Sequence, residues 1–100
     1  MDERDLTIRA ATPADADALR RLAELDSARP LTGVVLVAEV GGAPLAAVAL
    51  GSGAAISDPF EPSAGAVEAL RLRRYQILRQ DGGQAPAWSV LRRLVPRRAI

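Results

Sequence analysis

Apolar and polar residues alternate with the period of a β-strand near the start of this chain. Leu6-Thr7-Ile8-Arg9 shows that alternation, which predicts a short, half-buried strand. Residues 34–40 and 43–50 are apolar runs, the first rich in β-branched side chains, and we expect a strand in each. Residues 54–57 are expected to add a shorter strand. The pattern therefore predicts a sheet of about four strands.

Glycines separate these predicted strands. The pair Gly41-Gly42 tolerates the positive φ of a two-residue hairpin turn, so the flanking strands are expected to be antiparallel neighbours. Residues 33–56 contain one charged side chain, Glu39, and are long enough to span a bilayer. Because glycines and Pro44 interrupt this stretch at strand-length intervals, the sequence favours strands over a transmembrane segment.

Two segments carry the signals of helices. Thr12 suits an N-cap, Pro13 suits the first helical position, and Asp15 falls in the first turn, where an acid complements the helix dipole. The apolar stripe of this first helix consists of Ala18, Leu19, Leu22 and Leu25. Residues 58–62 then break the pattern, and Ser63 is expected to cap a second helix that ends at about Gln80.

The composition excludes several kinds of chemistry. The chain has no Cys and no His, so thiol nucleophiles, imidazole bases and nearly all zinc sites are excluded. No carboxylates are spaced like an oxygen-ligand loop, so we expect no metal ion. The charged N-terminus lacks the apolar stretch of a secretory signal, and the expected compartment is the cytoplasm.

Charge is distributed unevenly along the chain, although the formal net charge is only +1. Residues 1–70 hold five Arg against eleven acidic residues, whereas residues 71–100 hold eight Arg against Asp81 alone. Either the two halves neutralise each other within one fold, or a basic tail contacts nucleic acid or an anionic membrane surface. We expect one domain at residues 1–80, followed by a Gly/Pro-punctuated, Arg-rich segment at residues 81–100.

The order strand, capped helix, loop, hairpin, strand and helix resembles the front half of a GNAT-type N-acetyltransferase. Residues 6–15, Leu-Thr-Ile-Arg-Ala-Ala-Thr-Pro-Ala-Asp, are similar to that family's first strand and helix start. Residues 37–47 are similar to its second and third strands, and the likeness extends over residues 6–80. The resemblance implies an α+β fold: a GNAT-like, truncated antiparallel sheet of about four strands with two main helices.

The loop that would bind acyl-CoA departs from the family's pattern. There the fourth strand leads into Arg/Gln-x-x-Gly-x-Gly/Ala, whose backbone N–H groups hold the pyrophosphate. Here Pro62 replaces the Arg or Gln, Gly65 matches the first Gly, and Val67 replaces the last small residue. Pro62 has no N–H to offer, and Val67 adds a branched side chain. We therefore expect no catalytic residues and no cofactor. Acetyl-CoA is an expected ligand only in the alternative that the chain is an acetyltransferase.

Three other residues of the first 80 are candidates for special roles. Arg74 falls in the apolar stripe of the second helix, so it needs an internal partner, for which Asp58 or Glu61 is the first choice and a bound anion the second. Tyr75 is expected to be a boundary side chain with a hydrated hydroxyl. Glu39 is expected to be a solvent-facing position on a half-buried strand.

The C-terminal segment carries the other interaction candidates. Residues 87–95 are expected to form a short helix, although a fifth strand parallel to the fourth also fits. A basic segment around an aromatic residue suits an anionic membrane surface, RNA or an acidic partner, or it folds onto the acidic first half of its own domain. The interaction candidates here are Trp88, Arg92, Arg93, Arg97 and Arg98.

Without a fifth strand the fourth would be an open sheet edge, so we expect that a second chain pairs with it or that the C-terminal segment covers it. The sequence thus favours a non-catalytic GNAT-like module that acts by protein association, as a homodimer or with another protein at this edge. Two alternatives stay open: an N-acetyltransferase with a degenerate site or one completed in an oligomer, and an Arg-tail adaptor for an anionic surface.

Overall fold

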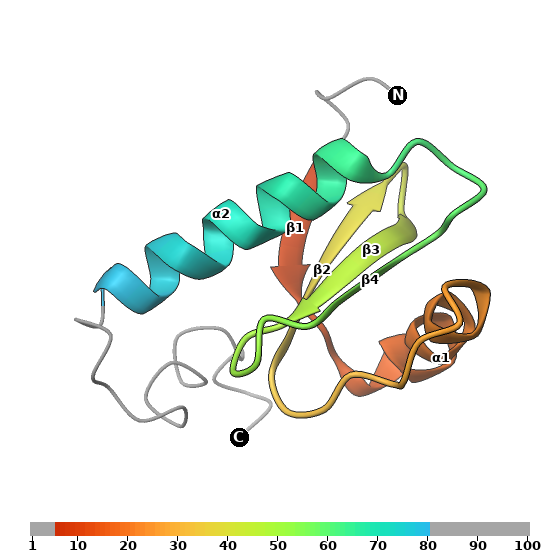
Figure 1. Cartoon of the computed structure of the whole chain (residues 1–100), viewed down its shortest axis with the longest axis horizontal. Helices are drawn as coiled ribbons and strands as arrows, with labels where there is room; N and C mark the ends of the chain where they lie inside the picture. Colours follow the sequence, from red (N-terminus) through yellow and green to blue (C-terminus); the bar gives the residue numbers. More distant parts are fainter. Residues whose placement is uncertain (1–5, 81–100) are drawn as a thin grey trace.

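The computed structural model describes residues 6–80 of the 100-residue chain. Four strands and two α-helices follow one another in the order that the hydrophobic pattern predicts (Figure 1). In chain order they are β1 (Leu6–Ala10), the short 3₁₀ helix η2 (Pro13–Asp15), α1 (Ala16–Leu25), β2 (Val35–Val40), β3 (Ala43–Ala49), β4 (Ala55–Ser57) and α2 (Ala64–Gln80). The predicted segment 87–95, together with Trp88 and the four tail arginines, lies outside the described residues.

The four strands form one antiparallel sheet in the order β1-β2-β3-β4, which confirms the predicted α+β class. Gly41 and Gly42 join β2 to β3 with φ values of 59° and 83°. Side chains with a Cβ rarely adopt such angles, so the two glycines set the hairpin and thereby the register of the two central strands. Residues 35–40 and 43–49 are thus strands, and no helix within residues 6–80 is long and apolar enough to cross a membrane.

The first helix starts differently from the prediction. Pro13–Asp15 is a 3₁₀ turn, and α1 itself begins at Ala16. The Asp15 carboxylate accepts the Thr12 N–H at 2.7 Å, so the acid caps the residue before the turn. This arrangement satisfies a backbone donor that helix starts otherwise leave without a partner.

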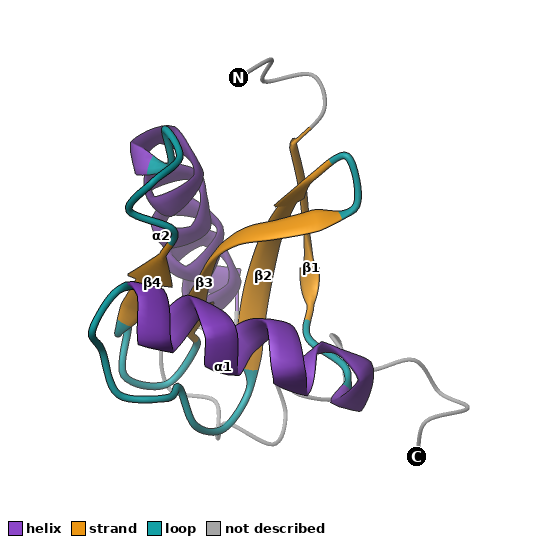
Figure 2. Cartoon of the chain, turned by 90° about the vertical axis from the view of Figure 1, so that its right-hand side faces the viewer, coloured by secondary structure: helices purple, strands orange, loops and turns teal. Residues whose placement is uncertain are grey.

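The sheet lies between the two helices, α1 on one face and α2 on the other (Figure 2). Alternate residues of β2 point to opposite faces: Val35 and Val37 join the α1 layer, while Leu36 and Ala38 join the α2 layer. Because both faces are covered, β2 is apolar at successive positions and does not alternate as a half-exposed strand would.

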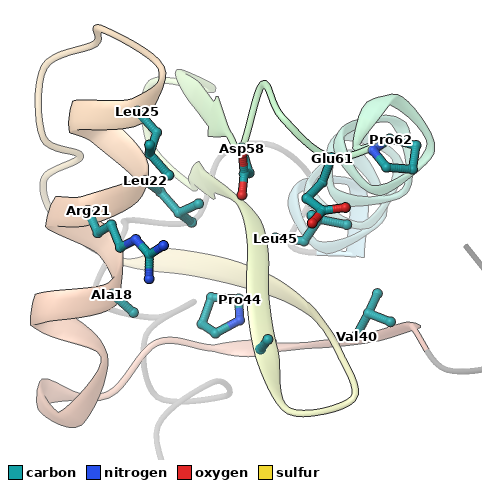
Figure 3. Close-up of a pocket in the computed structure, with 11 residues that line it drawn as sticks. Ala18, Arg21, Leu22, Leu25, Val40, Pro44, Leu45, Asp58, Glu61 and Pro62 are labelled. Atoms are coloured by element: carbon teal, nitrogen blue, oxygen red, sulfur yellow. The ribbon is translucent and has the colours of Figure 1, made fainter.

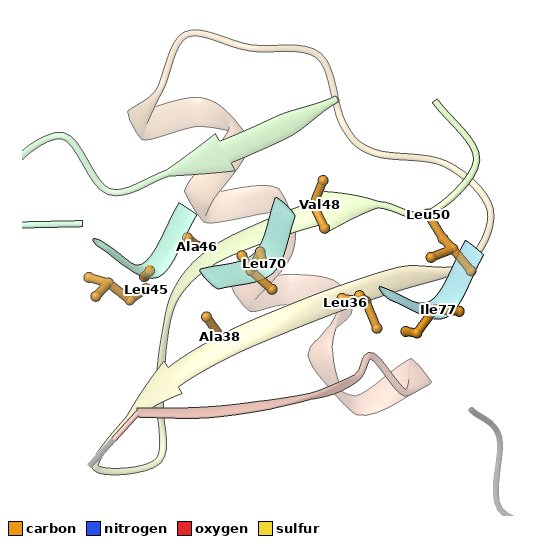
Figure 4. Packing of buried hydrophobic residues seen from close by; sticks show 9 residues of the cluster. Leu36, Ala38, Leu45, Ala46, Val48, Leu50, Leu70 and Ile77 are labelled. Atoms are coloured by element: carbon orange, nitrogen blue, oxygen red, sulfur yellow. The ribbon is translucent and has the colours of Figure 1, made fainter. Parts of the chain in front are cut away.

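The larger layer packs α2 against the sheet (Figure 4). Leu70 is fully buried at the middle of α2, and Ile77 lies two turns later against Leu36 and Leu50. Aliphatic side chains and alanines fill this layer, as expected for a chain with three aromatic residues. The apolar stripe that the sequence predicts in the second helix includes Leu70 and Ile77, and both are buried against the sheet.

An irregularity in the hairpin shapes the edge of this layer. Ala38 pairs with Ala46 and Glu39 pairs with Pro44, so Leu45 is an extra residue on β3. Such a β-bulge re-aims a side chain, and Leu45 and Ala46 consequently both join the α2 layer. The Leu45 carbonyl accepts the Asp58 N–H at 3.0 Å, which ties the bulge to the segment after β4.

Candidate functional site

A pocket of about 530 Å³ opens beside the bulge (Figure 3). One side of it is α1, one side is the segment that follows β4, and the hairpin of β2 and β3 lies between them. The volume is within the range of pockets that bind ligands or side chains. The pocket is lined by Ala18, Arg21, Leu22, Leu25, Val40, Ala43, Pro44, Leu45, Asp58, Glu61 and Pro62.

Charges of opposite sign lie on the two walls of this pocket. Arg21 extends from α1, and Asp58 and Glu61 come from the opposite wall (Figure 3). Among the described residues, no carboxylate lies within 4.0 Å of the Arg21 guanidinium. The α1 wall of the pocket is therefore positively charged and the opposite wall negatively charged, with apolar residues between them.

The segment after β4 holds Phe60 in an exposed position. The Asp58 carboxylate accepts the Phe60 N–H at 2.8 Å, and the Asp58 carbonyl accepts the Ser63 hydroxyl at 3.1 Å. These hydrogen bonds join polar groups within the turn and hold its conformation, as in Asx turns. Phe60 is nevertheless 80% exposed, more than any other large apolar residue in the described part of the chain.

The same segment leads into the three positions that the expected resemblance compares with an acyl-CoA-binding loop: Pro62, Gly65 and Val67. Pro62 is exposed at the pocket rim, and Gly65 is the second residue of α2. A Cβ at Gly65 would meet no atom within 4 Å, so nothing in the packing requires a glycine there. Val67 packs against the α2 layer of the core. All three residues therefore fit a plain loop that enters a helix.

The outer edge of β4 is partly closed within the chain. The Asp58 N–H points to β3, so the N–H of the preceding residue, Ser57, points away from the sheet. The Asp26 carboxylate, directly after α1, accepts that N–H at 3.1 Å. A charged group that occupies an edge donor hinders a further strand. An added strand would have to displace Asp26.

Arg74 has a partner other than the predicted one. Its Nε donates to the Leu50 carbonyl at 2.7 Å and its Nη2 to the Gly51 carbonyl at 3.1 Å. The prediction that Arg74 pairs with Asp58 or Glu61 is wrong, because the guanidinium reaches the turn between β3 and β4. There it satisfies two carbonyls that have no strand partner and joins α2 to the sheet.

An ion-pair network that the sequence pattern did not predict joins β1, the η2 turn and β2. Arg9 on β1 donates to both Asp15 oxygens at 2.8 Å and to Glu39 at 3.0 Å. The hydrogen bonds from Arg9 and, with a smaller effect, from the Thr12 N–H lower the pKa of Asp15 to about 2. Burial acts in the opposite direction and would raise this pKa. Asp15 and Glu39 in turn raise the pKa of Arg9.

Glu39 therefore differs from the predicted solvent-facing position, because its half-buried carboxylate binds Arg9. In the sheet Glu39 pairs with Thr7, so Arg9 is its diagonal neighbour on the adjacent strand, a register that the sequence did not predict. Tyr75 is 56% exposed, so it lies on the solvent side of α2 and not at the predicted boundary, and its hydroxyl accepts a hydrogen bond from the Arg79 guanidinium at 3.4 Å.

Within residues 6–80 no group of three or more acidic side chains is arranged to hold a metal ion. The pocket lining contains carboxylates and a guanidinium but no hydroxyl side chain. Its pronounced features are thus an apolar floor and opposed charges, and the segment that forms one of its walls also carries the exposed Phe60. No family model, no curated protein and no solved structure matches this chain.

Proposed function

We propose that the chain is a non-catalytic GNAT-like module that acts by protein association, and that its partner is a second copy of itself. The observation that carries the proposal is Phe60, which is 80% exposed on a hydrogen-bonded turn beside a pocket with an apolar floor. In this dimer the Phe60 of each copy enters the pocket of the other. A two-fold contact of this kind needs a projection and a complementary pocket on the same surface.

The burial of Phe60 supplies the main driving force. Transfer of an exposed Phe side chain into an apolar site contributes about 2 kcal/mol, and a two-fold dimer buries two of them. The bonds from Asp58 and Ser63 hold the turn before the partner arrives, so little conformational freedom is lost on association. A contact confined to this turn and pocket is small, so we expect a dissociation constant of about 10–100 µM.

The charges of the pocket give the contact its orientation. When the turn of one copy enters the pocket of the other, Glu61 of the turn approaches Arg21 on the facing α1 wall. Such rim pairs contribute little energy but disfavour wrong orientations. This interface also replaces the predicted pairing at the β4 edge, where the Asp26 carboxylate already occupies the Ser57 N–H.

Phe60→Ser is expected to weaken the dimer about 1,000-fold, because it removes two buried rings from each dimer. Leu72→Ser is the matched control, since it also removes an exposed apolar side chain, 58% exposed on α2. Analytical ultracentrifugation should show a monomer for Phe60→Ser and an unchanged equilibrium for Leu72→Ser. Equal dimerisation of Phe60→Ser and the unaltered chain would disprove the proposal.

A mixing experiment tests the reciprocal geometry. Ala43→Trp fills the pocket from an exposed position and keeps Phe60, whereas Phe60→Ser keeps the pocket. Each variant alone is expected to be monomeric, while the mixture regains one Phe60-in-pocket contact and forms a weak heterodimer. A mixture that stays as monomeric as its components at millimolar concentration contradicts a reciprocal contact.

The enzymatic alternative receives less support from the structure. Asp58 and Glu61 place negative charge directly before the N-terminus of α2, where an acyl-CoA pyrophosphate would need to bind. Pro62 adds no donor there. The geometry therefore favours association over acyl transfer.

Calorimetric titration with acetyl-CoA is expected to give no saturable heat up to millimolar ligand and no rise in melting temperature. A ligand that binds the folded state must stabilise it, so the two readouts check each other. Saturable micromolar binding with a matching thermal shift would restore the acetyltransferase alternative and refute a cofactor-free module.

A further inference from the structure

The solvent face of α2 carries two large apolar side chains that the core does not use. Leu72 is 58% exposed and Tyr75 is 56% exposed, and they lie one turn apart. Leu70 and Ile77, which face the sheet, lie on the opposite side of the same helix. α2 therefore has one apolar face against the core and a second, smaller one towards solvent.

Arginines flank this second face, and the exposed Glu68 lies one turn before Leu72 on the same stripe. Arg79 follows Tyr75 on the same stripe, with its guanidinium carbon 5.9 Å from the ring centroid. Helical periodicity places Arg71 on one side of the stripe and Arg73 on the other, and both are exposed. In Figure 1 the C-terminal end of α2 extends past the strands. The outer face, defined here as Arg71, Leu72, Arg73, Tyr75 and Arg79, is thus a projecting basic and apolar ridge.

We propose that this outer face binds the surface of an anionic lipid bilayer. Interfacial helices combine exposed apolar or aromatic side chains with Lys or Arg beside them, so that the rings enter the headgroup layer while the charges reach phosphates. Each basic side chain close to an anionic membrane surface adds measurable attraction. The helix would lie along the bilayer surface and would not span it.

The shape of the face favours a bilayer over other anionic partners. A fluid headgroup layer adapts to a projecting helix, whereas a folded acidic protein would need a groove that matches it. Nucleic acid would bind the arginines but would make no use of Leu72. The Tyr75 ring, on which a base could stack, is already covered by the Arg79 guanidinium. The proposal does not depend on the Phe60 dimer, which uses the turn before α2 and the pocket lined by α1 and the hairpin.

The test is co-sedimentation of the full chain with phosphatidylcholine vesicles that contain or lack phosphatidylglycerol. Arg73→Gln/Arg79→Gln is compared with Arg20→Gln/Arg29→Gln, which removes the same charge from exposed positions outside α2. Every variant keeps the C-terminal arginines, so a difference between the two variants reports the outer face. We expect the α2 variant to bind anionic vesicles about 30-fold more weakly than the control.

Leu72→Ala tests the apolar part of the contact and is expected to reduce vesicle binding at least about 5-fold, since it removes carbon atoms that would enter the headgroup layer. Binding to vesicles without phosphatidylglycerol should be negligible. Equal binding of the two double variants would overturn the proposal, because charge elsewhere would then drive binding. Loss of vesicle binding on addition of RNA, with no effect of Leu72→Ala, would assign the face to nucleic acid and overturn it as well.

Discussion

Leu70→Ala is expected to lower the free energy of unfolding by about 3 kcal/mol. Leu70 has no exposed surface and lies at the centre of the layer between α2 and the sheet, against side chains of β2 and β3. Loss of a buried Leu costs the transfer energy of the missing atoms and the energy of the cavity that remains. Small domains bury little surface in total, so this is a large part of the stability of a 100-residue chain.

Leu72→Ala is the matched control on the same helix, because Leu72 is 58% exposed. Its effect should be below about 0.5 kcal/mol. Urea titrations followed by circular dichroism measure both variants. If Leu70→Ala and Leu72→Ala destabilise the chain equally, α2 does not pack against the sheet through its Leu70 face.

Asp15→Asn is expected to cost about 2 kcal/mol at neutral pH, and the cost should vanish in acid. Arg9 and Thr12 lower the pKa of Asp15 from 3.8 to about 2 in the folded chain. A carboxyl whose pKa is lower in the folded state stabilises the fold above its unfolded pKa, and this contribution is lost as pH falls through the folded value. The stabilisation should therefore be complete above about pH 5 and decline between about pH 4 and pH 2.

Asp17→Asn provides the control for this prediction. Asp17 is highly exposed and pairs with Arg20 on the surface of α1, so its removal should change stability little at any pH. Melting temperatures at a series of pH values separate the two variants. If the unaltered chain and Asp15→Asn keep the same stability difference from neutral pH down to about pH 2, the Arg9–Asp15 pair is not formed as described.

Local signals predicted most of the elements. The hairpin follows from Gly41-Gly42, because two adjacent positive φ values suit few residues other than glycine. The start of the first helix follows from Thr12, Pro13 and Asp15, although the local pattern did not distinguish a 3₁₀ turn from α-helix there. The buried face of α2 follows from the spacing of Leu70 and Ile77.

Features that join distant parts of the chain could not be predicted in this way. The partner of Arg74 lies 24 residues away in a turn, and no local pattern shows which carbonyls lack a strand partner. The bond from the Ser57 N–H to Asp26 spans 31 residues and depends on how α1 ends beside β4. The pocket is likewise lined by three separate parts of the chain, α1, the bulged hairpin and the segment after β4, which the Asp58 N–H ties to the Leu45 carbonyl.

The most direct test of the central claim is sedimentation velocity of the unaltered chain over roughly 1 µM to 1 mM. The Phe60 interface predicts a change from monomer to dimer with a midpoint in the tens of micromolar. It also predicts that the dimer persists in high salt, since burial of Phe60 dominates over the exposed charge pairs. A chain that sediments as a monomer over the whole range would contradict the proposal that this module acts by self-association.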